Sequence, residues 1–280
     1  DGKYVDSYAK RPSEEPREDS DGRAESDAKF SVKEYRYKGS DGKGHTKKET
    51  HFGFKIHAIC EVRTGLPAAF LVEPANSDER KALENMVGAF PDWQKGRAYA
   101  IMADRGYDST ELIKYLKGAG IIPVIDIRDC WKDGEETRQY KNTDIVYDYA
   151  GQVYYVDGAG KKRKMLYRGY DASRNCLRYE YRGKRHRISV GYDERVFLPI
   201  ARDSKKFERL YRARTSVERL NGRIDRDFMF EDHCLRGLAK TRLMVGLSFI
   251  VMNAMALGKI KEGISEGLAA HTKAGGPKAA

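Results

Sequence analysis

The chain has 280 residues, enough for one large domain or for one domain with a sizeable insertion. Hydrophobic residues make up 40% of it, so a buried core can form, and the formal net charge of +11 indicates a polyanionic partner. The four cysteines are too far apart in sequence to form a paired zinc-ligand signature, and the longest apolar run, residues 243–257, is too short to span a bilayer.

The first predicted region, residues 1–127, opens with a loop and two strands. Residues 11–48 are poor in large apolar residues and rich in charge, Gly and Ser, which predicts a long surface loop. Alternating apolar residues over 51–62 predict a strand, and a Thr-Gly turn leads into a second strand over 66–72.

Two further strands, each preceded by a helix, complete this region. A short, mostly apolar stretch over 97–103 predicts a buried strand, and 121–127 predicts another. The helix between them is expected to begin at Asp108 or Ser109. Strands that alternate with helices in this way indicate an α/β fold.

The periodicity changes after this region. Residues 128–202 are rich in Tyr and β-branched residues and are broken by turn signals, which predicts a small antiparallel β insertion. Residues 203–258 have apolar positions every three or four residues and predict helices, the last of them apolar over most of its surface and therefore buried. Residues 259–280 are predicted to be a flexible tail. Because the chain has no starting Met, we expect a fragment of a longer protein.

Asp104 is the first candidate for chemistry. It lies where the predicted strand 97–103 gives way to a turn that contains glycine. Ligands in open α/β sheets collect beyond the carboxyl ends of such strands. An aspartate that merely closes a turn or caps a helix is the structural alternative.

A polar stripe on a predicted helix is the second candidate. On one helix, a single face would carry Tyr211, Arg214, Glu218, Asn221 and Asp225. Tyr, Arg and Asn donate hydrogen bonds and are suited to holding phosphates around one carboxylate. The alternative is the ordinary polar face of a surface helix.

Four motifs stand in order along the chain: Asp1-Gly2-Lys3; the segment HFGFKIH, followed by Thr64-Gly65-Leu66-Pro67; the segment ADRGYDS around Asp104; and Tyr211, Arg214 and Glu218 with two and three residues between them. Together they resemble the DDE transposases of bacterial insertion sequences, in the branch marked by a Tyr-x2-Arg-x3-Glu signature. The resemblance runs from Asp1 to about Gly258.

The resemblance implies a fold and an active site. It implies an RNase H-like mixed sheet flanked by helices, with the antiparallel β insertion before the last catalytic helix. It also implies that Asp1, Asp104 and Glu218 are the catalytic, metal-binding carboxylates. Two Mg²⁺ or Mn²⁺ ions are the expected cofactors, because hard divalent ions prefer oxygen ligands.

The resemblance also implies a function and its setting. The expected reaction is metal-dependent phosphodiester cleavage at element ends, followed by strand transfer into target DNA. The expected partner is double-stranded DNA, which the protein would bind as a homodimer and without a membrane. The expected location is the bacterial cytoplasm, in association with the nucleoid.

Two departures from the family pattern leave alternatives open. The pattern usually continues with Lys or Arg seven residues after the Glu, but this chain has Asp225 there. The basic contact is then shifted to Arg223 or Arg226, or it is absent. Asp6 is an alternative to Asp1 as the first catalytic aspartate.

The strongest signal outside the active site is the basic segment 161–190. Residues 151–280 carry 28 Lys/Arg against 14 Asp/Glu, so the basic excess lies in this part of the chain. Basic residues bind phosphates, and the interleaved Tyr167, Tyr170, Tyr179 and Tyr181 would stack on exposed bases. A solvated hairpin face is the alternative. The predicted DNA-binding residues are Tyr211, Arg214, Arg223, Arg226, Lys161, Lys162, Arg163, Lys164, Arg185 and Arg187.

Two other functions fit parts of the sequence. An inactive or domesticated relative would bind DNA without cutting it, and a cleavage assay separates it from an active transposase. A basic nucleic-acid-binding scaffold with no active site would bind no divalent metal, whereas the enzyme would.

Overall fold

The computed structural model describes residues 2–9, 25–39, 42–129 and 131–269. It divides the chain into two compact units, one made of residues 1–86 and 215–280 and the other of residues 87–214. Each unit is described on its own below.

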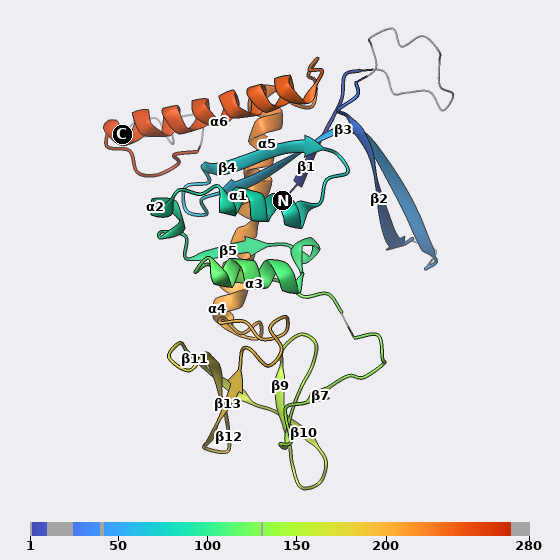
Figure 1. The fold of residues 1–280 in the computed structure, drawn as a ribbon, viewed down its shortest axis with the longest axis vertical. Helices are drawn as coiled ribbons and strands as arrows, with labels where there is room; N and C mark the ends of the chain where they lie inside the picture. The colour runs from blue at the N-terminus through green and yellow to red at the C-terminus, as the bar shows by residue number, and fades with distance from the viewer. Residues whose placement is uncertain (1, 10–24, 40–41, 130, 270–280) are drawn as a thin grey trace, which may run out of the picture. The chain divides into compact units, whose positions relative to one another are not determined.

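The first unit is built on an antiparallel sheet in which β3 is central (Figure 1). β3 pairs with β1, β2 and β4, and every pairing is antiparallel. The strands are β1(Gly2–Asp6), β2(Lys29–Lys38), β3(Gly44–Cys60) and β4(Pro67–Pro74), and the helices are α1(Glu79–Gly88), α5(Ser216–Phe228) and α6(Leu238–Lys261).

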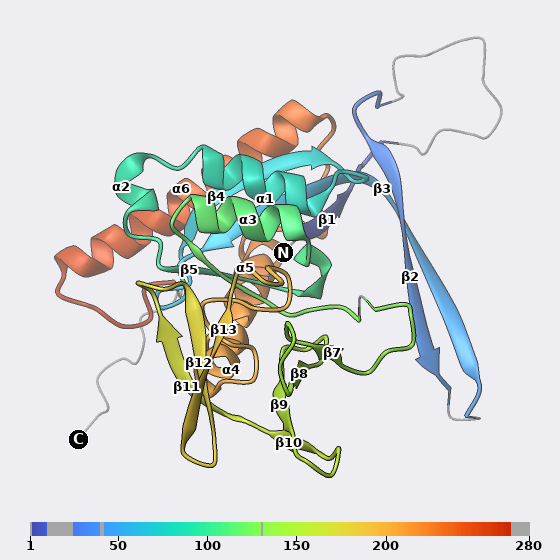
Figure 2. The same cartoon turned by 60° about the horizontal axis from the view of Figure 1, so that its bottom comes forward.

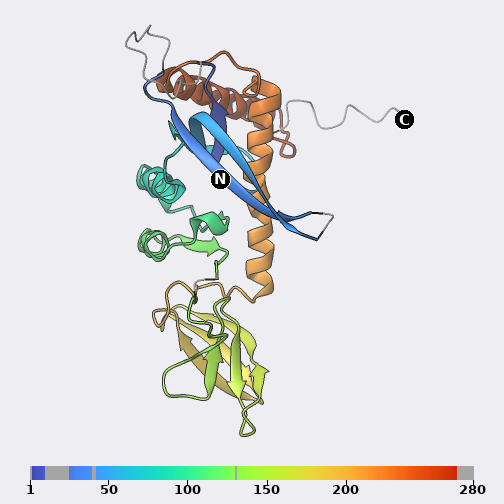
Figure 3. The same cartoon turned by 90° about the vertical axis from the view of Figure 1, so that its right-hand side faces the viewer.

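One face of this sheet packs on α5 and α6 to form the core of the unit. The core joins Phe54 and Ile56 of β3 to Leu220 and Ile224 of α5 and to Phe249 of α6. Figure 3 shows α5 alongside the sheet. The pattern arises because alternate residues of β1 and β3 point to this face, whereas the residues between them point to the other.

Gly53 is the point at which three strands meet. It pairs with Asp6 of β1 and with Lys29 of β2, and its φ is 157°. A Cβ at this position would lie 2.3 Å from the carbonyl oxygen of Val5. The sheet therefore requires glycine here.

The prediction of a loop over residues 11–48 is wrong for the parts of β2 and β3 that lie within it. Residues 29–38 and 44–48 are strands paired in continuous register. Their large residues, such as Val32 and Tyr37, are more than half exposed, so they do not show the buried alternation by which strands are recognised. Residues 10–24 and 40–41 of the predicted loop lie outside the described residues.

The prediction that the last helix is buried over most of its surface is also wrong. α6 buries Val245, Phe249 and Met252 against the sheet, whereas Leu243 and Ile250 are 60% and 64% exposed. Hydrophobic composition shows that a helix is apolar but not how many of its sides are covered. Among the described residues, α6 is also the one helix long and apolar enough to cross a bilayer by length and composition, a test that core helices also pass.

The second unit begins with the predicted strands and helix. Strands β5(Ala100–Ala103) and β6(Ile122–Ile125) pair in parallel, with α2(Asp92–Lys95) before them and α3(Thr110–Gly118) between them. Ser109, one of the two predicted caps, accepts a hydrogen bond from the backbone nitrogen of Leu112 at 3.1 Å. Asp108 is instead buried and forms an ion pair with Arg195 at 2.7 Å.

The β-rich part of this unit forms two antiparallel sheets, as predicted (Figure 2). The sheets share a core that contains Tyr147, Tyr179 and Phe197. The first sheet is β7(Arg138–Gln139), β8(Ile145–Tyr147), β9(Val153–Val156) and β10(Lys162–Lys164), and the second is β11(Leu166–Asp171), β12(Cys176–Tyr181) and β13(Lys184–Ser189). After them come α4(Lys205–Arg212) and the 3₁₀ turn η2(Ala213–Thr215).

Candidate active site

Asp104 directly follows β5 and begins the short 3₁₀ turn η1(Arg105–Tyr107). Its Oδ1 accepts a hydrogen bond from the backbone nitrogen of Gly106 at 2.7 Å. A Cβ at position 106 would lie 2.8 Å from that oxygen, so glycine allows the carboxylate to close the turn. The side chain therefore caps the turn through one of its two carboxylate oxygens, as the structural alternative predicts.

Asp126 is a second carboxylate at the same end of the parallel strands. It follows β6, and Ala103 pairs with Ile125, so Asp104 and Asp126 come after matched positions of the two strands. Arg105 donates from Nε to Asp126 Oδ2 at 2.8 Å. The sequence analysis missed Asp126, although the rule that selected Asp104 applies to it equally.

Tyr211 and Arg214 lie in the same unit as these carboxylates. The ring of Tyr211 stacks on Phe207, and the guanidinium of Arg214 lies 5.4 Å from the centre of the Tyr211 ring. Burial raises the pKa of Tyr211, and the charges of Asp126 and Asp104 raise it further, whereas Arg214 lowers it. Tyr211 is therefore within electrostatic range of Asp104, and Arg214 lies against the Tyr211 ring.

Glu218 lies in the first unit, in the first turn of α5, and it is exposed. The positive end of the helix dipole favours a carboxylate at this position. The single helix predicted for the polar stripe is interrupted, because η2 separates α4 from α5. Glu218 therefore shares a helix with Asn221 and Asp225, whereas Tyr211 and Arg214 belong to the preceding elements.

A family model described as a transposase DDE domain matches residues 23–254, which is most of the chain. The chain belongs to the transposase DDE domain family. The matched residues include Asp104 and Glu218 but neither Asp1 nor Asp6. No curated protein and no solved structure matches the chain.

Family membership makes the chain a DNA transposase, an enzyme that acts on DNA. The DDE family generally uses divalent metal ions. The remaining predicted site residues can be placed in this transposase domain one by one.

The first catalytic aspartate has two candidates, and they differ in placement. Asp1 lies outside the described residues. Asp6 is exposed and faces His51 Nδ1 at 3.2 Å. Its neighbour Val5 points to the opposite face of the sheet, where it joins the core with α5. Asp6 therefore points to the face of the sheet opposite α5, the helix that bears Glu218.

Asp225 fills the slot where the family pattern has a base, and it pairs with Lys3 of β1. The Lys3 ammonium donates to Asp225 Oδ2 at 2.7 Å, and the two side chains are 16% and 17% exposed. The positive charge at this place therefore comes from β1 rather than from α5. The sequence analysis did not find this pair, since its members are more than two hundred residues apart.

The predicted DNA contact through Arg223 requires correction. Arg223 is buried, and its guanidinium donates to the carbonyl oxygens of Gly65 and Ala269. This arginine therefore ties α5 to the β3–β4 turn. Arg226 is exposed and pairs with the adjacent Asp227 at 2.7 Å, so it stays a predicted DNA contact.

The basic residues predicted to bind DNA in the second unit are exposed. They lie on β10 and β13 and in the turn before β10: Lys161, Lys162, Arg163, Lys164, Arg185 and Arg187. Arg163 pairs with Asp157 at 3.0 Å. Arg187 lies directly opposite Arg178 in the β12–β13 ladder, an arrangement of like charges that is unfavourable by itself.

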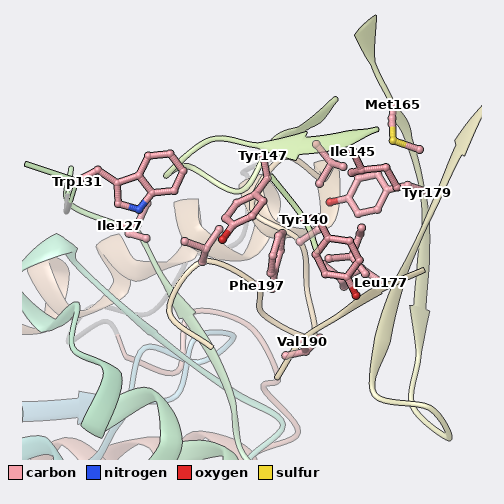
Figure 4. Packing of buried hydrophobic residues seen from close by; sticks show 14 residues of the cluster. Ile127, Trp131, Tyr140, Ile145, Tyr147, Met165, Leu177, Tyr179, Val190 and Phe197 are labelled. Carbon is pink, nitrogen blue, oxygen red and sulfur yellow. The ribbon is translucent and has the colours of Figure 1, made fainter. Parts of the chain in front are cut away.

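The interpretation of the interleaved tyrosines as base-stacking groups is wrong for Tyr179. Tyr179 is fully buried in the core of the two β sheets (Figure 4). Tyr167, Tyr170 and Tyr181 pack against the same core. The alternation of Tyr with Arg and Lys therefore reflects a sheet with one buried and one charged face.

The donor chemistry fits divalent metal ions. The predicted ligands Asp104 and Glu218 are carboxylates, and carboxylate oxygens are the ligands that Mg²⁺ and Mn²⁺ prefer. On α5, three residues after Glu218, the Oδ1 atom of Asn221 is buried and has no hydrogen-bond partner within the part of the chain described. Within that part no group of three or more His, Cys, Asp or Glu side chains gathers, and Asp1 lies outside it.

Proposed function

We propose that this transposase domain cuts the ends of a bacterial insertion sequence and joins them to target DNA, in an RNase H-like fold. The observation that carries the proposal is the electrostatic interaction of Tyr211 with Asp104, with Arg214 against the Tyr211 ring and both residues shortly before α5, which bears Glu218. Family membership supports it, because residues 23–254 include this whole signature. The proposed setting is a homodimer on DNA in the bacterial cytoplasm.

In this proposal the catalytic carboxylates are Asp1, Asp104 and Glu218. When bound, two Mg²⁺ or Mn²⁺ ions supply activation of the attacking hydroxyl and stabilisation of the leaving oxygen. The chain orients the carboxylate of Asp104 through the hydrogen bond from Gly106 to its Oδ1.

Arg214 and Tyr211 bind the phosphate next to the scissile bond. The aromatic ring holds the guanidinium in place through a cation–π contact, and the planar set of N–H groups has the geometry that pairs with phosphate oxygens. Arg105 is kept in position by Asp126, so its positive charge is neutralised before DNA arrives.

The experiment compares metal binding with cleavage. We expect Mn²⁺ or Mg²⁺ to raise the melting temperature of the protein and to support nicking of supercoiled DNA. Asp104→Asn and Glu218→Gln should each abolish nicking and reduce the metal-dependent rise. Asp92→Asn, an equal charge change on α2, is the matched control and should do neither. A wild-type protein that binds DNA but neither nicks it nor responds to metal would be an inactive relative and would overturn the proposal.

A further inference from the structure

The outer part of β2 and β3 forms a two-stranded extension of the first unit, here called the β2–β3 ribbon, residues 31–38 and 44–51. Within the described residues, positions 44–52 of β3 have β2 as their only strand partner. β1 and β4 pair with β3 from Gly53 and Phe54 onward. Figures 1 and 2 show the two strands continuing past the ends of β1 and β4.

The ribbon exposes side chains on both of its faces. Val32 is 56% exposed on one face, and Tyr35 and Tyr37 are 44% and 53% exposed on the other. A two-stranded ribbon alone in water is marginally stable at best. Large aromatic side chains on such an element are therefore better explained by a partner than by the fold.

Cross-strand contacts keep the ribbon in register without that partner. Lys48 pairs with Glu34 at 2.9 Å, and the rings of Tyr37 and His45 stack. At its base, Tyr4 of β1 stacks on His51. The ribbon is thus preorganised, so a partner would not have to order it on binding.

The ribbon is basic. Residues 31–38 and 44–51 carry five Lys/Arg against two Asp/Glu. The strand register places Lys33, Tyr35 and Tyr37 on one face, together with His45, Lys47 and Glu49 from the facing strand, where Lys47 and Glu49 form an ion pair at 2.6 Å. Positive charges therefore alternate with aromatic rings on this face. Such a surface is suited to a polyanion that also has flat or apolar groups.

We propose that the β2–β3 ribbon lies in the major groove of duplex DNA. The major groove, about 12 Å wide, admits a two-stranded ribbon, and the lysines of both strands then reach the phosphates on either side. The proposal rests on the proposed function only in taking DNA as the substrate. A second copy of the chain is the less favoured occupant, because pairing two ribbons edge to edge would bring two sets of like charges together.

The test measures DNA binding by the whole chain at several salt concentrations. The ribbon variant combines Lys33→Ala, Lys38→Ala and Lys43→Ala. The matched control variant combines Lys81→Ala, Lys240→Ala and Lys261→Ala, which remove the same charge from exposed positions on α1 and α6. The ribbon variant should bind duplex DNA at least tenfold more weakly at 0.15 M salt. Its slope of log affinity against log salt should fall by about 2–3, since each phosphate contact contributes roughly 0.9. The control variant should lower neither the affinity nor the salt slope by as much.

Three results would overturn the proposal. The first is equal losses of affinity in the ribbon variant and the control, which would show that only net charge matters. The second is a Tyr35→Ser/Tyr37→Ser variant that loses self-association and keeps its full salt slope, because the occupant would then be a second copy. The third is an excess of a minor-groove ligand that weakens wild-type binding to the level of the ribbon variant, because the ribbon would then occupy the minor groove. Metal-dependent nicking by the wild type is scored separately, so a failed active site and a failed ribbon give different outcomes.

Discussion

The ion pair between Lys3 and Asp225 offers the sharpest test of how the first unit is held together. It joins β1, which follows the predicted catalytic Asp1, to α5, which carries Glu218. We predict that Asp225→Asn and Lys3→Met each destabilise the protein. The reason is that each substitution leaves the remaining charge, which is mostly shielded from water, without its partner.

The magnitude follows from the exposure of the two side chains. Removing one partner of a fully buried pair costs about 3–5 kcal/mol, whereas exposed pairs contribute about 0–1 kcal/mol. With side chains 16% and 17% exposed, the pair falls between these limits, and we expect a loss of about 2 kcal/mol. For a protein of this size that is a fall in Tm of roughly 4–8 °C.

Denaturant unfolding of the single variants and of the Lys3→Met/Asp225→Leu double variant measures this loss. The double variant should recover part of the stability, because it removes both charges and leaves neither unpaired. Arg226→Gln, which breaks the exposed pair with Asp227, is the control and should cost no more than about 0.5 kcal/mol. The reasoning is refuted if the single variants unfold at the wild-type denaturant concentration, or if their losses simply add in the double variant.

Two further predictions concern acid stability and DNA binding. Burial, with a smaller effect from Lys55, lowers the pKa of His57 to about 3. The folded protein therefore keeps this ring neutral while the unfolded chain takes up a proton below about pH 6.5, so stability is complete above that pH and is lost as the pH falls towards 3. By pH 4.5 the free energy of unfolding, measured in unfolding titrations, should have fallen by about 2–3 kcal/mol. His57→Gln should flatten this dependence of stability on pH. An equal slope of stability against pH in the wild type and the variant would contradict the assignment to His57. In the basic segment, we replace four residues together by Ala: Lys161, Lys162, Arg163 and Lys164. This variant should bind DNA more weakly, and its slope of log affinity against log salt should fall by up to about 3–4. An unchanged slope would show that these residues do not contact DNA.

Local signals in the sequence were enough to predict the α/β elements and the position of Asp104. The strand 100–103 is short and apolar, and Ser109 has the side chain that a helix N-terminus requires, so each depends on a few neighbouring residues. The antiparallel strands between residues 138 and 189 were likewise indicated by β-branched and aromatic residues between turns.

Features that depend on distant partners could not be predicted in this way. β2 exists because β3 supplies its hydrogen bonds, and its own side chains are mostly exposed. Arg223 has the appearance of a DNA contact until the carbonyl of Gly65 is brought next to it. Tyr179 alternates with arginine as a stacking residue would, and only the core that its sheet shares with the first sheet shows that it is buried.

The strand geometry of the β2–β3 ribbon also determines how the length of the ribbon can change. Neighbouring residues on a strand point to opposite faces, so removing one residue from each strand would carry Tyr35 and Tyr37 to the face that now bears Val32. Removing two residues from each strand would preserve the faces and shorten the ribbon by about 7 Å, close to two base-pair steps of a DNA duplex. The length of this element is therefore adjustable in increments of four residues per hairpin, measured outward from Gly53 as a fixed origin.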